Sequence, residues 1–169
     1  MALTSTITRY DASWPARFQA ARAQIAPGLR LRAGRHPSCR QHSGAGLAAK
    51  PEIDLLAVVS AHRDEARRDE ALRGLGYVRG SDLSTGHHFH RRDIDGVRTH
   101  KIHVCAEGHA QIGRMLRFRD LLRQDPLLRR RYQALKLELE ASNTGGIGEY
   151  LAGKAPFIDE VMAVRRDQA

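Results

Sequence analysis

The sequence predicts an α/β (α+β) fold, in which a small mixed β-sheet is flanked by helices and the C-terminal part is helical. Three observations lead to this prediction: an apolar run at 52–59, two extended segments around Asp95-Gly96, and amphipathic segments on both sides of them. The chain has 169 residues, which is enough for one domain with a substantial core. Because no linker, internal repeat or low-complexity stretch interrupts it, we assign residues 1–169 to a single domain.

The first predicted element is a helix over residues 13–26. Ser13 is a suitable cap, and Pro15 fits the first turn, where a missing N–H costs nothing. Pro27-Gly28 is expected to end the helix.

A strand and a second helix are predicted next. Residues 52–59 are mostly apolar and bounded by polar residues, as in a buried strand. Residues 60–73 follow a helical pattern, with Ser60 as the cap and Gly74 after the last turn.

A β-hairpin and a helical region complete the chain. "HHFHRRD" (87–93) and "VRTHKIHVCA" (97–106) flank Asp95-Gly96, a strong signal for a tight turn between antiparallel strands. Three further helices are predicted, over 109–124, 126–141 and 149–165.

The charge of the chain restricts its partners only weakly. The formal net charge is +9, yet most arginines are interspersed with acidic residues, and Arg129–Arg131 fit a solvated helix face. An RNA partner would rest on charge alone and would bind in a steeply salt-dependent way. No apolar run approaches the roughly 18 residues of a membrane span, and no signal peptide is recognisable, so we expect a cytoplasmic protein without a membrane partner.

Glu52 and Asp54 lie at the start of the predicted strand. Residues two apart share one face of a strand, so the two carboxylates would point the same way and repel each other. A divalent metal ion would relieve this repulsion, whereas two solvated side chains at a strand entry are the alternative. Asp93 and Asp95 flank the hairpin turn, and turn chemistry accounts for them.

The histidines of the hairpin suggest a second metal, zinc. "HHFH" places His88 and His90 on one face of its strand, whereas His100 and His103 point to opposite faces of the next strand. They lack the four-ligand spacing of a structural zinc site. Exposed histidines at a sheet edge are the alternative.

Several segments, taken together and in this order, resemble the GrpB family of small bacterial proteins. They cover nearly the whole chain: "YDASWPARF" at 10–18, "GLAAKPEIDLL" at 46–56, "LRGLGY", "RTHKIHV", "FRDLLRQDP", "YQALKLEL" and "YLAGKAPFI". The resemblance implies a nucleotidyltransferase-like fold.

In that superfamily a Gly-Ser turn holds nucleotide phosphates, and acids on the following strand bind metal. The resemblance therefore implies Mg²⁺ as cofactor, held by Glu52 and Asp54, and a nucleotide or phosphorylated small molecule as the partner. No general base is assigned. Four residues are implied as contacts for phosphate or substrate: Lys50, Arg98, His103 and Lys154.

The segment 33–45 departs from the family pattern. The family has His-x-Gly-Ser-Thr and then Pro-Gly-Leu before its Lys-Pro, but here Ala45 replaces the proline, and Arg40–His42 stand where Gly-Ser-Thr is expected. A local reading-frame slip would explain the abrupt return of the match at Gly46, and resequencing the DNA tests this. If the segment is genuine, the alternative function is a non-catalytic accessory or binding protein with a degenerate transferase site.

Overall fold

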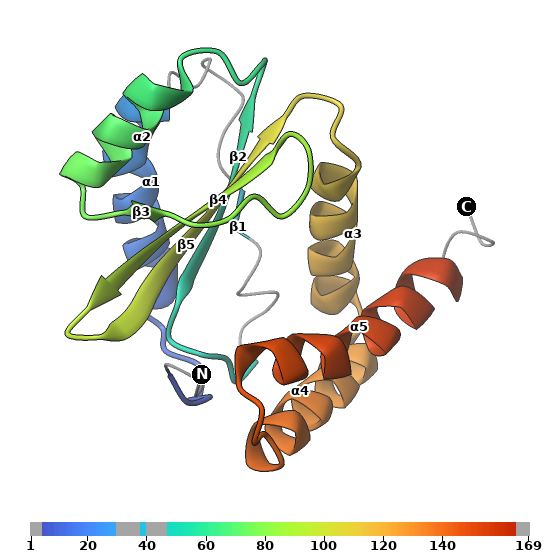
Figure 1. The fold of residues 1–169 in the computed structure, drawn as a ribbon. Helices are drawn as coiled ribbons and strands as arrows, with labels where there is room; N and C mark the ends of the chain where they lie inside the picture. The colour runs from blue at the N-terminus through green and yellow to red at the C-terminus, as the bar shows by residue number, and fades with distance from the viewer. Residues whose placement is uncertain (1–4, 30–37, 40–46, 165–169) are drawn as a thin grey trace. The chain divides into compact units, whose positions relative to one another are not determined.

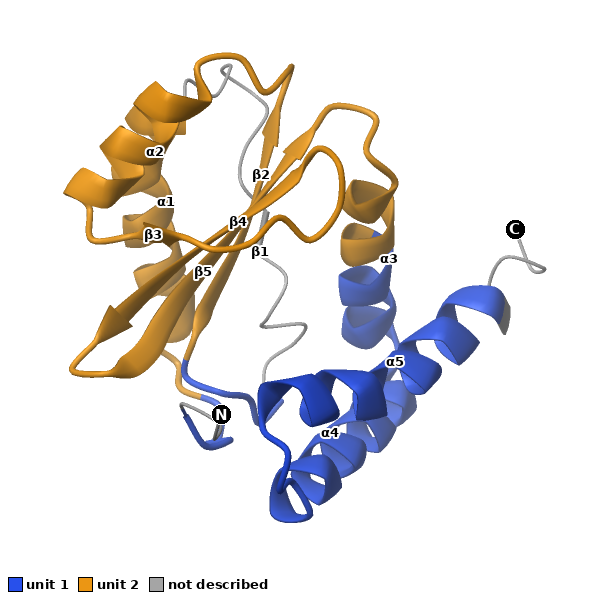
Figure 2. Cartoon of the chain, viewed as in Figure 1, with its two compact units in different colours: residues 1–10, 42–51, 117–169 blue, residues 11–41, 52–116 orange. Residues whose placement is uncertain are grey.

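The computed structural model describes residues 5–29, 38–39 and 47–164 (Figure 1). The chain divides into two compact units (Figure 2). We call residues 11–41 and 52–116 the sheet unit, and residues 1–10, 42–51 and 117–169 the helical unit. Among the described residues, no helix is long and apolar enough to cross a membrane.

The sheet unit is built on a mixed sheet of five strands in the order β1-β2-β5-β4-β3. The inner strand β2 runs parallel to the central strand β5, and the other neighbouring pairs are antiparallel. The predicted mixed sheet is therefore confirmed. The strand bounds are β1 Ser38–Cys39, β2 Ile53–Val59, β3 Val78–Arg79, β4 His87–Ile94 and β5 Val97–Ala106.

The predicted hairpin is confirmed as β4 and β5. Asp95 and Gly96 have φ angles of 51° and 76°, the left-handed conformation that a tight two-residue turn between twisted strands requires. The turn fixes the register, so that Phe89 pairs with His103 and Arg91 with Lys101.

The two faces of the sheet meet different helices. On one face Leu56 of β2 and Cys105 of β5 pack against Met115 of α3 (Ala110–Gln124). On the other face, alternate residues of β4 meet α2 (Glu65–Gly74), where Arg68 bonds to His88. Because strand side chains alternate, the face of Leu56 also carries Asp54 and His103.

Two predicted helix boundaries in the sheet unit were wrong. Helix α1 (Trp14–Leu29) continues through Pro27-Gly28, and a Cβ on Gly28 would lie 2.9 Å from Cβ of Ala71. A glycine is needed there because α1 packs closely on α2. The second helix begins at Glu65 after Asp64, which has a left-handed φ of 58°, rather than after Ser60.

The late start of α2 has a tertiary cause. His62 precedes the helix, and its Nε2 lies 2.8 Å from the carbonyl oxygen of Gly86. This hydrogen bond ties the loop between β2 and α2 to the loop before β4, so the helical periodicity at 60–64 is overridden.

The helical unit contains the end of α3 with α4 (Pro126–Ala141) and α5 (Ile147–Val164). Asp125 caps α4 by accepting hydrogen bonds of 2.9 Å from the amides of Leu127 and Leu128, as the Asp-Pro start predicts. The ring of Tyr132 on α4 packs against Phe118 of α3 and Phe157 of α5, with centroids 5.2 and 5.5 Å away. The core cluster consists of Phe118, Leu121, Leu122, Leu128, Tyr132, Val161 and Met162.

A buried lysine in the helical unit predicts an unusual pH dependence of stability. Lys136 donates a hydrogen bond of 2.6 Å to the carbonyl oxygen of Ala48, and burial lowers its pKa from 10.5 to about 8. Between these two pH values the unfolded chain holds a proton that the folded chain has lost. The contribution of Lys136 to the free energy of unfolding is therefore lowest below pH 8, and it should rise by about 3 kcal/mol as the pH rises towards 10.5.

Denaturant unfolding across this pH range measures the rise. In Lys136→Met this rise should disappear. The variant should compare best with the wild type near neutral pH, where the wild type must keep a charged amine buried. A rise of the same size in Lys136→Met would show that other groups cause it.

Candidate functional site

Glu52 and Asp54 lie on the same face at the start of β2, as predicted. Glu52 directly precedes the strand and is 2% exposed, whereas Asp54 is partly buried. Parallel pairing places Asp54 beside Lys101 and Leu56 beside His103 of β5. The neighbouring strand therefore presents cationic or ionisable side chains to this carboxylate pair.

Lys101 forms an ion pair with Glu52, between Nζ and Oε2. The ammonium thus offsets the charge of one carboxylate, which relieves the repulsion within the pair without a metal ion. Sequence reasoning missed this lysine, although the alternation along 97–106 puts Lys101 and His103 on one face.

His103 lies beside the second carboxylate, with Nε2 3.8 Å from Oδ1 of Asp54. Its other ring nitrogen, Nδ1, lies 2.9 Å from Nε2 of His87 on β4. Both imidazoles are buried. Since one nitrogen of the pair must donate to the other, His87 restricts the ring orientation and the tautomer of His103.

These residues limit what metal ion the site can hold. Two carboxylates with a third acid would suit a pair of Mg²⁺ ions, but the described part of β5 offers Lys101 and His103 at the facing positions. Asp54 and His103 together supply an oxygen and a nitrogen ligand for one divalent ion. A nitrogen ligand suits Mn²⁺ or Zn²⁺ as well as, or better than, Mg²⁺.

Arg98 does not join this group. Its Nε lies 3.5 Å from Oδ1 of Asp93, across the hairpin near the turn. The hairpin register shifts between Arg92 and Asp93, so simple alternation does not extend to Arg98. Its partner Asp93 also lies 3.5 Å from Arg91, whose own pair is Lys101. The predicted role of Arg98 as a phosphate or substrate contact stays a prediction.

Lys50 and Lys154 belong to the helical unit, and both lie against one tyrosine ring. The Nζ atoms of Lys50 and Lys154 are 4.8 and 4.4 Å from the ring centroid of Tyr150, which is 4% exposed. A ring face attracts cations, so Tyr150 holds two ammonium groups in one place. Two neighbouring positive charges make a natural anion-binding element.

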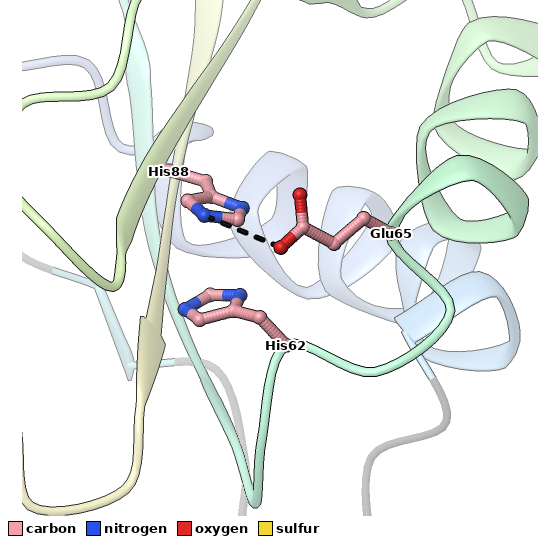
Figure 3. A group of neighbouring side chains, drawn as sticks. All are labelled: His62, Glu65 and His88. Carbon is pink, nitrogen blue, oxygen red and sulfur yellow. Dashed lines mark ion pairs between the residues drawn. The ribbon is translucent and has the colours of Figure 1, made fainter.

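The hairpin histidines do not gather into one zinc site among the described residues. His87 bonds to His103, whereas Nε2 of His90 lies 2.9 Å from Oδ1 of Asp69 on α2. His88 instead meets His62 and Glu65, as Figure 3 shows. The sequence prediction missed these two residues, because they come from the loop before α2 and from its first turn.

Most of the segment 33–45 lies outside the described residues. Its described part, Ser38–Cys39, forms β1 and pairs antiparallel with Leu55 and Leu56 of β2. The reading-frame hypothesis for this segment stays a prediction.

Sequence comparisons identify relatives along nearly the whole chain. The family model described as "GrpB protein" matches residues 4–164. A UPF0157 protein of Halalkalibacterium halodurans is 32% identical over 161 residues, which cover 93% of this chain and 80% of the relative. A UPF0157 protein of Streptomyces coelicolor is 29% identical over 168 residues, 97% of this chain and 84% of the relative.

Structural comparisons support the nucleotidyltransferase-like fold. The crystal structure of the conserved protein GrpB from Enterococcus faecalis matches with a TM-score of 0.83 at 24% identity, over 97% of this chain and 100% of that one. The Cid1 poly(U) polymerase in its MgGTP-bound form matches with a TM-score of 0.55 at 14% identity. This second match covers 87% of the chain but only 50% of Cid1, so it shows the fold alone. From the family match and the identity to these relatives, we conclude that the chain belongs to the GrpB family, also called UPF0157.

Proposed function

We propose that this protein binds a nucleotide or a phosphorylated small molecule together with one divalent cation, and that Asp54 is the principal ligand of that cation. The observation that supports this proposal most directly is the position of Glu52 and Asp54, on one face at the start of the inner strand β2 of a nucleotidyltransferase-like fold. Cid1, which has a similar fold, is described with MgGTP bound.

The bound cation would neutralise phosphate charge and orient the phosphate oxygens. Asp54 supplies a carboxylate oxygen, and His103 stands beside it with its ring held by His87. Lys101 keeps the charge of Glu52 balanced. In the helical unit, the ammonium groups of Lys50 and Lys154 on Tyr150 supply separate candidate contacts for an anion.

A second candidate function is a non-catalytic binding or accessory role. The ion pair of Lys101 with Glu52 favours it, because an ammonium already partners one of the two acids that would otherwise bind metal. In this function the site recognises its ligand but transfers no nucleotidyl group.

Thermal unfolding of the full chain with ATP, CTP, GTP and UTP tests binding, each without metal, with Mg²⁺ and with Mn²⁺. A nucleotide at about 100 times its Kd should stabilise the fold by roughly 2.7 kcal/mol, a rise of about 5–11 °C in the unfolding temperature. The shift should require the metal and vanish in Asp54→Asn. Asp95→Asn is the matched control, because it removes the same charge at the hairpin turn, where asparagine tolerates the positive φ.

Release of pyrophosphate, measured with hydroxyl-bearing acceptors such as RNA and small alcohols present to take the nucleotidyl group, then separates the two candidate functions. Binding with release supports a transferase, and binding without release supports the accessory role. A wild-type protein that no nucleotide stabilises with either metal, or an Asp54→Asn variant that is stabilised equally well, would contradict the proposed site.

A further inference from the structure

A second polar cluster lies on the opposite face of the sheet from Asp54. It joins His62 before α2, Glu65 in the first turn of α2 and His88 on β4, and one ligand atom of each lies within 4.8 Å of the others (Figure 3). The rings of His62 and His88 are stacked, with centroids 3.8 Å apart. Segments distant in sequence thus bring two imidazoles and a carboxylate together.

The ring nitrogens of the two histidines are oriented by specific partners. The carbonyl of Gly86 accepts from Nε2 of His62 at 2.8 Å, so Nδ1 is the ring nitrogen that faces Arg68. A carbonyl that binds the second nitrogen is a common support for a histidine that ligates a metal.

Arg68 is the cation that this cluster holds in the present structure. Its Nη2 lies 2.9 Å from Nδ1 of His88, and its Nη1 lies 3.4 Å from Nδ1 of His62. Arginine can only donate hydrogen bonds, so both Nδ1 lone pairs converge on one guanidinium. A buried arginine more often pairs with a carboxylate, and here its closest carboxylate is Asp69 at 3.8 Å.

Carboxylates surround the other side of the His88 ring. Its Nε2 lies 3.8 Å from Oε1 of Glu65 and 3.9 Å from Oδ2 of Asp82. Both distances exceed a hydrogen bond, but a divalent ion bonded to all these atoms would need only small side-chain movements. Asp82 also accepts a hydrogen bond of 2.6 Å from Arg79, which keeps it near the cluster.

We propose that His62, Glu65 and His88 form a binding site for a transition-metal ion, with Zn²⁺ as the best match, and that Arg68, which lies on Nδ1 of both rings, must give up Nδ1 of His62 when the metal binds. Two imidazoles and one carboxylate are a ligand set typical of zinc, and a fourth position stays open to water or to Asp82. Mg²⁺, which prefers oxygen ligands, should bind here poorly.

The first experiment measures Zn²⁺ and Co²⁺ binding to the full chain, purified without a histidine tag and stripped of metal by a chelator. Calorimetry gives stoichiometry, and the visible spectrum of Co²⁺ reports whether nitrogen and oxygen ligands surround the ion. In Asp54→Asn, which lacks the carboxylate of the proposed nucleotide site, we expect one ion per chain and a higher unfolding temperature with Zn²⁺ but not with Mg²⁺. The variants His88→Gln and Glu65→Gln should each weaken binding at least about tenfold.

Matched controls separate the site from nonspecific binding. Glu70→Gln removes a carboxylate from the exposed side of the same helix, and His100→Gln removes a histidine from the neighbouring strand β5. Both controls should bind Zn²⁺ as the wild type does. Because the His88 and Glu65 variants are also compared in the Asp54→Asn protein, the outcome is independent of the proposed nucleotide site.

Competition with Arg68 gives a signature that a purely structural cluster would lack. Arg68→Met should bind Zn²⁺ more tightly than the wild type, because the resident cation no longer has to move. Circular dichroism checks that this variant folds, and the histidine and glutamate variants test the site if it does not. Wild-type protein that does not bind Zn²⁺, or binding that His88→Gln and the His100→Gln control weaken equally, would overturn the proposal.

Discussion

Replacing Lys101 by methionine should lower the free energy of unfolding by about 3 kcal/mol, because it removes the ammonium from a carboxylate inside the protein. Glu52 is 2% exposed and forms an ion pair with Lys101. Methionine keeps the length and apolar part of the lysine side chain, so the change isolates the charge. Denaturant unfolding measures the difference.

A double-mutant cycle with Glu52→Gln identifies the ion pair as the cause. Once the carboxylate is neutral, the loss of the lysine should cost much less, and the double variant should be more stable than Lys101→Met alone. Lys154→Met, in the helical unit, is the matched control. It should change the free energy of unfolding by the same amount whether residue 52 is glutamate or glutamine. Additive effects of the two changes would show that Lys101 and Glu52 do not depend on each other.

The same variant tests how the carboxylate pair uses a metal. If Lys101 competes with a divalent cation for Glu52, then Mg²⁺ or Mn²⁺ should stabilise Lys101→Met more than the wild type. Equal metal stabilisation of both proteins would place the cation on Asp54 alone.

Leu122→Ala should destabilise the protein by about 3 kcal/mol, through loss of buried surface and the cavity that remains. Leu122 is 1% exposed and belongs to the core cluster of the helical unit. The single tryptophan, Trp14, lies in the sheet unit, so its fluorescence reports on that unit, whereas far-ultraviolet circular dichroism reports on the helices of both units.

The two probes test whether residues 1–169 behave as a single domain. One cooperative domain predicts that Leu122→Ala moves both unfolding transitions to the same lower denaturant concentration. Leu137→Ala is the control, because this leucine of α4 is 44% exposed and its loss should change little. A transition by circular dichroism that shifts while the Trp14 transition stays in place would show that the two units unfold separately.

Local signals were sufficient to predict much of the fold. Asp95-Gly96 identifies the hairpin because only a few residue types adopt the left-handed turn it needs, and Asp125-Pro126 identifies the start of α4 by its cap and its missing N–H. The shared face of Glu52 and Asp54 follows from strand geometry. In each case the interaction that decides the structure lies within a few residues of sequence.

The tertiary structure alone decided which side chains meet at the candidate sites. The parallel register of β2 and β5 brings Lys101 to Glu52, although nearly fifty residues separate them, and no local pattern fixes that register. The loop contact of His62 with Gly86 delays the start of α2 and brings His62 to His88. The sequence therefore determined the elements and the faces of this protein, because hydrogen bonding and side-chain periodicity are local. Only the folded chain determined the partners of its charged groups, because those depend on how distant strands and helices pack.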